Sequence, residues 1–239
     1  MKILTENQIK EVCNKYGQGA SSPQLAKIFN ISDVAIRGLL KRRNIPIRNQ
    51  KNAQRKCFFD KTAFDNITEE SAYWIGFLMA DGNIHYNHGN SPQISLVLAN
   101  KDKGHLYKFR RFLCSSHAII SIKDAKRFSF RSDILANKLK EYGITPNKSH
   151  TAKVNDCLQD NQHFWRGVID GDGWISSGHI PALELVGSNF LLEQFRRFIQ
   201  TNFPKNSSTV RPHKNIFKIG FCRGVTKDIL FLLYSNCTV

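Results

Sequence analysis

The sequence lacks paired cysteine spacings, histidine clusters and apolar runs of membrane-spanning length. Its six cysteines are scattered at positions 13, 57, 114, 157, 222 and 237. This pattern argues against a zinc site or a disulfide framework and indicates reduced, intracellular thiols. The N-terminus also lacks the apolar segment of a signal peptide. We therefore expect a soluble intracellular protein with no membrane segment, in the cytoplasm, the nucleoid or an organelle matrix.

Acidic residues are scarce. The chain has 19 Asp and Glu against 35 Lys and Arg, a formal net charge of +16. Such an excess favours a polyanionic partner, most often a nucleic acid. Charge alone fits RNA-binding and ribosomal proteins equally well. The 239 residues, 41% of them hydrophobic, suffice for one large domain and one small domain.

A nine-residue stretch occurs twice in the chain. Residues 74–82 read WIGFLMADG, and residues 165–173 read WRGVIDGDG. Each predicts an apolar helix with small residues four positions apart, which places them on one face where two backbones can approach closely. These predicted interface residues are Gly76, Ala80, Gly167 and Gly171.

Both stretches end in Asp-Gly, at Asp81-Gly82 and Asp172-Gly173. Glycine is common where the end of a helix turns left-handed. A carboxylate in the last turn faces the negative end of the helix dipole and costs stability, so its presence in both copies indicates a role beyond structure. The alternative is two unrelated buried helices that end in a common turn pair.

The repeat extends beyond the motif. Gly76 and Gly167 are 91 positions apart, and so are Phe130 and Phe221. After each motif the pattern predicts two strands, a helix carrying Phe-Arg-Arg-Phe, two strands and a last helix. The predicted ranges are 83–86, 93–98 and 133–142 in the first half, and 174–177, 182–186 and 225–235 in the second.

Paired motifs of this form, each followed by such a unit, resemble the LAGLIDADG homing endonucleases in their single-chain form. The resemblance covers about residues 69–239. It implies an α+β fold of two pseudo-symmetric αββαββα repeats with saddle-shaped antiparallel sheets, at 69–150 and 151–239. The two motif helices would pack side by side, and because one chain holds both halves we expect a monomer.

The resemblance also implies that Asp81 and Asp172 meet at the pseudo-twofold axis and hold Mg²⁺ or Mn²⁺ at the scissile phosphates. Two adjacent carboxylates repel unless a cation lies between them or one is protonated. Magnesium suits a few carboxylates completed by phosphate oxygens and water, and it activates water for hydrolysis. In similar enzymes a lysine at the place of Lys148 lies near the metals and stabilises charge. The alternative for Lys148 is an ordinary surface lysine.

Residues 1–47 predict a separate unit of three helices, capped by Thr5, Ser22 and Ser32. In the third helix we expect Val34, Ile36, Leu39 and Leu40 to face inward. The unit resembles a resolvase-type helix-turn-helix, whose last helix enters the major groove. Its reading face would be Ser32, Asp33, Arg37 and Lys41. The alternative is a small helical bundle with a solvated basic face.

Residues 48–68 predict an extended basic linker. Between positions 37 and 56 there are eight basic residues and no acidic residue, and Pro46 argues against a continuous helix. Arg48, Lys51 and Arg55 would contact phosphates, or the arm would enter a minor groove. A solvated charge run is the usual alternative.

The predicted strands alternate apolar and polar residues. Phe128 and Phe130 share one face, whereas Arg127, Ser129 and Arg131 share the other. We expect helices to cover the apolar face, and the polar face to lie in the major groove of double-stranded DNA. The candidate DNA contacts are Asn83, His85, Gln93, Ser95, Lys123, Arg127, Arg131, Arg211, His213 and Lys218.

These patterns together predict a site-specific double-strand DNA endonuclease. The alternative is a DNA-binding regulator or intron maturase that retains the fold without cleaving. Relatives usually continue past the last helix with a second basic residue, whereas this sequence stops at Val239, which leaves the non-cleaving alternative open. An intein endonuclease is disfavoured, since the chain opens with Met1-Lys2 and closes without His-Asn.

Overall fold

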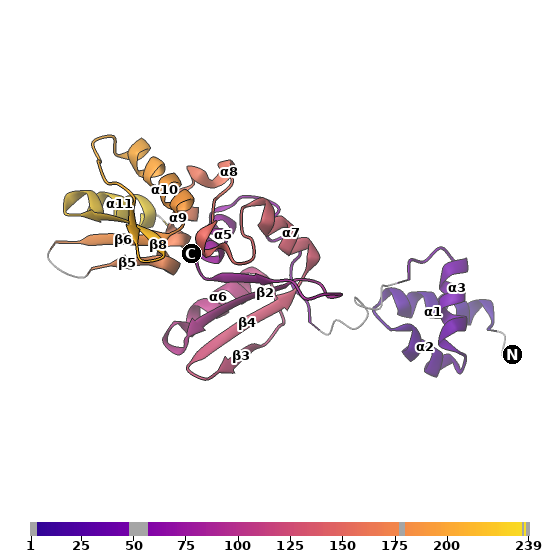
Figure 1. The fold of residues 1–239 in the computed structure, drawn as a ribbon. Helices are drawn as coiled ribbons and strands as arrows, with labels where there is room; N and C mark the ends of the chain where they lie inside the picture. Colours follow the sequence, from indigo (N-terminus) through magenta and orange to yellow (C-terminus); the bar gives the residue numbers. More distant parts are fainter. Residues whose placement is uncertain (1–3, 48–56, 177–179, 236, 238–239) are drawn as a thin grey trace. The chain divides into compact units, whose positions relative to one another are not determined.

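The computed structural model describes residues 4–47, 57–176, 180–235 and 237, and the chain divides into two compact units, Met1–Lys56 and Cys57–Val239 (Figure 1). The predicted linker contacts Arg48, Lys51 and Arg55 lie outside the described residues. No helix in the described parts of the chain is both long enough and apolar enough to cross a membrane.

The first unit consists of α1 (Glu6–Gly17), α2 (Ser22–Phe29) and α3 (Asp33–Arg42) around a small apolar core. Ser21, not Ser22, caps α2, because its hydroxyl accepts from the N–H of Gln24 while the Gln24 side chain accepts from the N–H of Ser21. The prediction for Val34 was also wrong. Its side chain is 77% exposed, since it lies on the opposite side of α3 from the buried Ile36.

The second unit contains the two predicted repeats. The first repeat has α5 (Glu69–Ala80), β1 (Gly82–His85), β2 (Gln93–Ala99), α6 (Lys103–Phe112), β3 (Ile119–Ile122), β4 (Ala125–Arg131) and α7 (Asp133–Glu141). After the short α8 (Asp156–Gln159), the second repeat has α9 (Gln162–Asp172), β5 (Gly173–Ile175), β6 (Ala182–Gly187), α10 (Asn189–Asn202), β7 (Arg211–His213), β8 (Ile216–Cys222) and α11 (Gly224–Tyr234). The predicted α+β class and element order are therefore confirmed.

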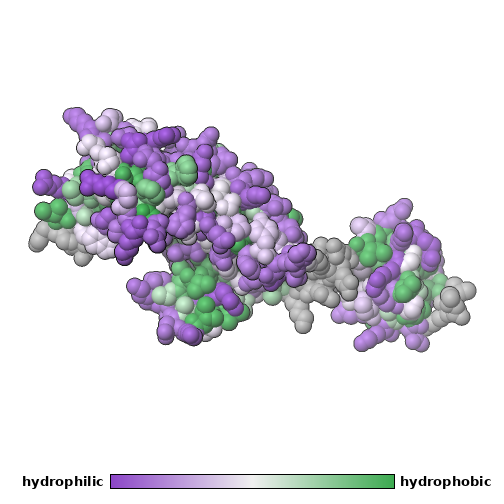
Figure 2. Space-filling model, in the orientation of Figure 1, coloured by the Kyte–Doolittle hydropathy of each residue, from purple (hydrophilic) through white to green (hydrophobic). Residues whose placement is uncertain are grey.

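Each repeat folds its strands into a four-stranded antiparallel sheet. The strand order is β1-β2-β4-β3 in the first and β5-β6-β8-β7 in the second, so the two repeats share one topology. One face of each sheet, the covered face, holds buried apolar residues such as Phe128 and Phe221 in one continuous core. The opposite, open face holds the polar residues that alternate with them. Hydrophilic residues cover most of the visible surface, with smaller apolar patches between them (Figure 2).

The two motif helices α5 and α9 pack side by side at the junction of the repeats. A Cβ added to Gly76 would lie 2.0 Å from the carbonyl oxygen of Phe164, and one added to Gly167 would lie 2.1 Å from that of Tyr73. At the ends of the helices, a Cβ on Gly171 would lie 2.4 Å from the Cβ of Ala80. The structure thus places all four predicted small residues where the two backbones touch.

Candidate active site

Both motif helices end directly in a strand, and this junction positions the two aspartates. Asp81 caps the C-terminus of α5 and Gly82 begins β1, while Asp172 ends α9 and Gly173 begins β5. A Cβ on Gly82 would lie 2.5 Å from the carbonyl oxygen of Leu78, and the equivalent distance from Gly173 to Ile169 is 2.4 Å. Neither glycine has a positive φ. The expected left-handed turn is therefore wrong, and close backbone approach is what requires glycine here.

The aspartates come from opposite repeats and meet where the two helices end. Asp81 Oδ2 lies 3.6 Å from the position that a Gly171 Cβ would occupy. The pKa of Asp172 is raised to about 6, first by burial and then by the negative charge of Asp81, while Lys148 opposes the shift. The pKa of Asp81 is also raised, first by partial desolvation. Asp172 is the more strongly affected because it is half-buried, whereas Asp81 is exposed.

Lys148 lies beside this carboxylate pair and is buried, so it is not an ordinary surface lysine. It stands in a short 3₁₀ turn (Lys148–His150), and only 9% of it is exposed. Its Nζ donates to the carbonyl oxygen of Ala80 at 3.3 Å and to that of Gly82. Burial lowers the pKa of Lys148, while the charges of Asp172 and Asp81 raise it. One buried cation therefore faces two carboxylates, with its ammonium held at the start of β1.

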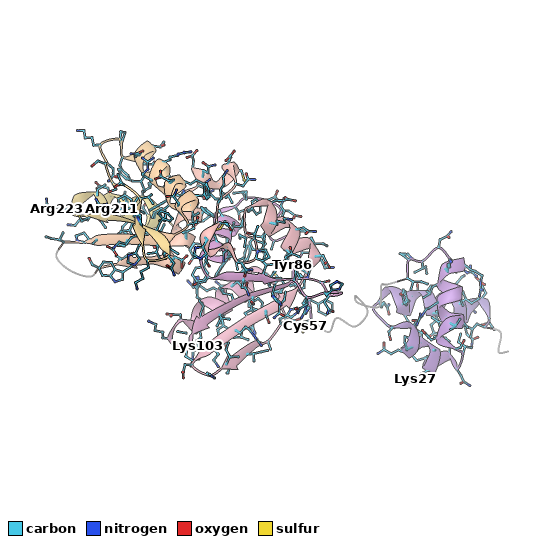
Figure 3. The ribbon with its side chains drawn as sticks, viewed as in Figure 1. Lys27, Cys57, Tyr86, Lys103, Arg211 and Arg223 are labelled. Carbon is cyan, nitrogen blue, oxygen red and sulfur yellow. The ribbon has the colours of Figure 1, made fainter. Side chains whose placement is uncertain are left out.

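The open faces collect the predicted DNA contacts. On the first sheet, His85 pairs with Gln93 and Gln93 with Arg131, whose guanidinium donates to the Gln93 side chain at 3.3 Å. Asn83, Ser95 and Arg127 share this face. On the second sheet, Arg211 pairs with Lys218 and His213 with Ile216. Lys123 lies outside both sheets, in the β3–β4 turn with a φ of 44°. Arg211 is labelled in Figure 3.

Solved structures with a similar fold include LAGLIDADG homing endonucleases, at low sequence identity. The homing endonuclease I-WcaI, bound to its DNA recognition sequence, is 15% identical with a TM-score of 0.52, covering 72% of this chain and 85% of that one. The LAGLIDADG meganuclease I-AabMI, bound to uncleaved DNA, is 12% identical with a TM-score of 0.50 and the same coverage. I-GzeII, in complex with its DNA target, is 11% identical with a TM-score of 0.50, covering 71% and 84%.

No family model matches the sequence. At identities of 11–15%, the similarity in structure shows the fold. The chain has the two-repeat LAGLIDADG fold. Within this fold, the carboxylate pair lies at the paired ends of the motif helices and the open faces flank it.

The LAGLIDADG core contains a polar link that sequence reasoning missed. Asp170, two residues before Asp172, accepts hydrogen bonds from Tyr73 at 2.7 Å and from Tyr234. His105 Nε2 lies 3.0 Å from the Tyr73 hydroxyl, and burial lowers the pKa of His105. The signal was available, because the first motif has Met79 where the second has this acid. What a single sequence does not give is which tyrosines reach it.

A second ionic link joins the same two helices. Arg166, only 1% exposed, places Nη2 3.3 Å from a carboxylate oxygen of Glu69 and its guanidinium carbon 4.9 Å from the centre of the Tyr73 ring. A buried charge pair of this kind is a poor source of net stability, but the loss of one partner strands the other charge. The junction of the repeats therefore depends on matched polar groups as well as on glycine contacts.

Two open-face residues of the second sheet were also missed. Trp174 is 56% exposed and pairs with Glu184 across β5 and β6. Glu184 lies 3.0 Å from Lys218 Nζ. Strand alternation places both residues on the same face as Lys218, but neither carries the basic, amide or hydroxyl group that marks the predicted DNA contacts. The open face is therefore less uniformly basic than the sequence suggested.

In the first unit, the predicted reading residues lie on the outside of α3. Ser32 caps the helix by accepting from the N–H of Ala35, so its hydroxyl is already engaged. Arg37 forms an exposed ion pair with Asp33, one turn away. Lys41 is exposed. Exposed ion pairs of this kind contribute little to stability.

Proposed function

We propose that this chain is a site-specific, metal-dependent endonuclease that cleaves both strands of DNA. The observation that carries the proposal is the junction of α5 and α9, where Asp81 and Asp172 from opposite repeats face one buried lysine. A carboxylate pair with raised pKa values, at a cost to stability, is typical of a functional site. The pairing of one acid from each repeat suits a substrate with two equivalent scissile bonds.

The donor set fits a hard divalent cation. The pKa values of both aspartates are raised, and a cation between them would relieve the repulsion. Among the described residues, no three His, Cys, Asp or Glu side chains converge as in a fully protein-ligated site. Water and phosphate oxygens would have to complete the coordination, which Mg²⁺ and Mn²⁺ accept. When bound, such an ion would supply Lewis-acid activation of water.

Lys148 has the charge and the position to act on the same phosphate. Its Nζ is held by two backbone carbonyl oxygens, so the ammonium is oriented before any substrate arrives. A fixed positive charge at a partly buried site stabilises a developing negative charge more effectively than a mobile surface lysine. We assign Lys148 this stabilising role in the proposed reaction.

The open faces of the two sheets would bind the DNA on either side of the carboxylates. Arg131 and Gln93 on the first sheet, and Lys218 and Arg211 on the second, have the donors and acceptors that read base edges in a major groove. The net charge of +16 supports phosphate contacts over a long site. The structural neighbours I-WcaI and I-GzeII are described with DNA bound, which is consistent with this surface.

The test is cleavage of a randomised duplex library with Mg²⁺ by the wild type and by Asp81→Asn and Asp172→Asn. We expect both variants to lose cutting while retaining DNA binding. Asp156→Asn, on α8, is the matched control and should cut like the wild type. Normal cutting by both motif variants would refute the site assignment.

A second candidate is a DNA-binding regulator with no nuclease activity. The three-helix unit favours it, because exposed Arg37 and Lys41 on α3 give the chain a second basic surface with its own small core. If α3 enters a major groove as in helix-turn-helix proteins, this unit alone would select a site. Stable binding of a defined duplex with Mg²⁺ present, and no strand breaks, would favour this reading over the endonuclease.

A further inference from the structure

Helix α6 has an outer surface that points away from the open face of the first sheet. Its inner side carries Leu106 and Phe109, both buried, and the ring of Phe109 packs edge-on against Phe128 at 5.7 Å. Phe128 belongs to the covered face, whereas its neighbour Arg127 belongs to the open face. A ligand on the outside of α6 would therefore not occupy the surface proposed for double-stranded DNA.

This outer surface combines unpaired positive charge with an exposed ring. A groove of about 560 Å³ runs along it between Gly104 and Ser115. The Tyr107 ring is 48% exposed at the groove, and the Arg110 guanidinium carbon lies 5.3 Å from the ring centre. The basic side chains that line the groove are Lys108, Arg110 and Arg111. None of them is in an ion pair within the part of the chain that the structure describes. Lys103 lies at the outer edge of the first repeat (Figure 3).

The second repeat provides an internal comparison, because α10 carries the same Phe-Arg-Arg-Phe sequence. Aligned on that sequence, Glu193 stands where α6 has Tyr107, and Arg196 stands where α6 has Arg110. Glu193 binds Arg196 at 2.7 Å, so the charge of that arginine is neutralised on its own helix. In α6 the place of Glu193 is taken by the Tyr107 ring, so Arg110 has no carboxylate partner on its own helix. The basic aromatic surface is therefore specific to one repeat.

We propose that the Tyr107 groove binds single-stranded nucleic acid. An exposed aromatic ring lets an unpaired base stack, and neighbouring arginine and lysine side chains hold the adjacent phosphates. The paired and stacked bases of a duplex offer no free face to the Tyr107 ring, so the groove selects single strands. RNA and DNA strands share this chemistry, and the ribose hydroxyl can bias the choice between them. The proposal does not rest on nuclease activity.

The first test is fluorescence anisotropy of the full chain with oligouridine and oligothymidine probes of about twelve nucleotides. We expect Tyr107→Ala to weaken binding by about 5- to 160-fold, the range for losing one stacked base. Tyr107→Phe should bind like the wild type because the ring remains. Tyr107→Glu, which copies the second repeat, should weaken binding at least as much as alanine. Arg197→Ala on α10 is the control and should change binding less than twofold.

The second test uses the exposed Cys114 at the end of the groove as a reporter. Bound oligonucleotide should slow alkylation of Cys114, while exposed Cys157 on α8 should react at an unchanged rate. Tighter binding of one probe would identify RNA or DNA as the preferred strand, and equal binding would mean that stacking alone selects the ligand. Unchanged affinity of Tyr107→Ala, or displacement of the probe by duplex as effectively as by single strands, would overturn the proposal.

Discussion

Tyr73 in the first motif helix donates a 2.7 Å hydrogen bond to Asp170 in the second, across the junction of the repeats. Asp170 also accepts from Tyr234 in α11, so one carboxylate joins three helices. Burial raises the pKa of both tyrosines, which therefore remain protonated donors through the working pH range. Because Asp170 and Asp172 lie two residues apart in α9, the hydrogen bonds to Asp170 also help to fix the position of the candidate catalytic carboxylate.

Removing the Tyr73 hydroxyl should weaken this junction. We expect Tyr73→Phe to lower the free energy of unfolding by about 1–3 kcal/mol, since a hydrogen bond to a charged group is lost. A double-mutant cycle with Asp170→Asn in urea unfolding should show a coupling of about 0.5–3 kcal/mol. Tyr73→Phe combined with Tyr142→Phe, whose hydroxyl donates to the carbonyl oxygen of Phe64, should be additive. Additivity in the Asp170 cycle as well would mean that the hydrogen bond contributes nothing.

Replacing the candidate metal ligand Asp172 by asparagine should stabilise the metal-free protein. The pKa of Asp172 is raised from 3.8 to about 6 in the folded state, so the folded state binds the proton more tightly. The wild type therefore loses stability as pH rises through this window, and the full penalty is present above about pH 6. After solvent screening of a half-buried group, we expect Asp172→Asn to gain about 1–2 kcal/mol at pH 7.5.

The measurement is urea unfolding with chelator at pH 7.5 and at pH 5. The gain from Asp172→Asn should shrink at pH 5, where the wild-type carboxyl is largely protonated. Asp228→Asn, at an exposed position on α11, should shift stability by less than about 0.5 kcal/mol at both values. A destabilised Asp172→Asn at pH 7.5 would contradict the view that the fold tolerates strain at this site for function.

Sequence reasoning reached the fold because the motif pair, the matched spacing and the strand alternation are all local or periodic signals. The same reasoning failed where partners come from elsewhere in the chain. Val34 is an apolar residue in a helix, but its side chain points outward. Asp170 links three helices only because Tyr73 and Tyr234 donate hydrogen bonds to it. The Asp-Gly sequence predicts a left-handed turn at Gly82, whereas the requirement for glycine there comes from contact with the backbone of Leu78.

Adding a methyl group at Gly76 should disrupt the packing of α5 on α9. Its Cβ would lie 2.0 Å from a backbone oxygen, which cannot move aside as a flexible side chain would. We expect Gly76→Ala to cost more than about 3 kcal/mol, or to prevent folding of the second unit. Gly104→Ala on α6, with nothing within 4 Å of its Cβ, should be neutral or stabilising by up to about 1 kcal/mol. Comparing the thermal unfolding of Gly76→Ala and Gly104→Ala distinguishes the effect of helix propensity from the effect of close packing.

The Glu184–Lys218 pair on the open face allows a test of whether these residues affect DNA binding through phosphate contacts or through recognition of bases. Glu184 lies 3.0 Å from Lys218 Nζ and competes with a phosphate for that ammonium. Glu184→Gln should therefore strengthen binding to unrelated duplexes and steepen the slope of log K against log salt by about 0.9, the value for one added phosphate contact.

Lys218→Ala should change the slope little, because its charge is already neutralised in the free protein. If the slope for Lys218→Ala is instead smaller than the wild-type slope by the full amount for one phosphate contact, DNA already displaces Glu184 from Lys218 when it binds to the wild type. In that case Glu184 is free to accept from a cytosine amino group, and its loss should relax specificity at one base pair instead of raising general affinity. Salt titrations of both variants on a cleaved site and on a scrambled duplex distinguish these outcomes, since only base reading depends on the sequence of the duplex.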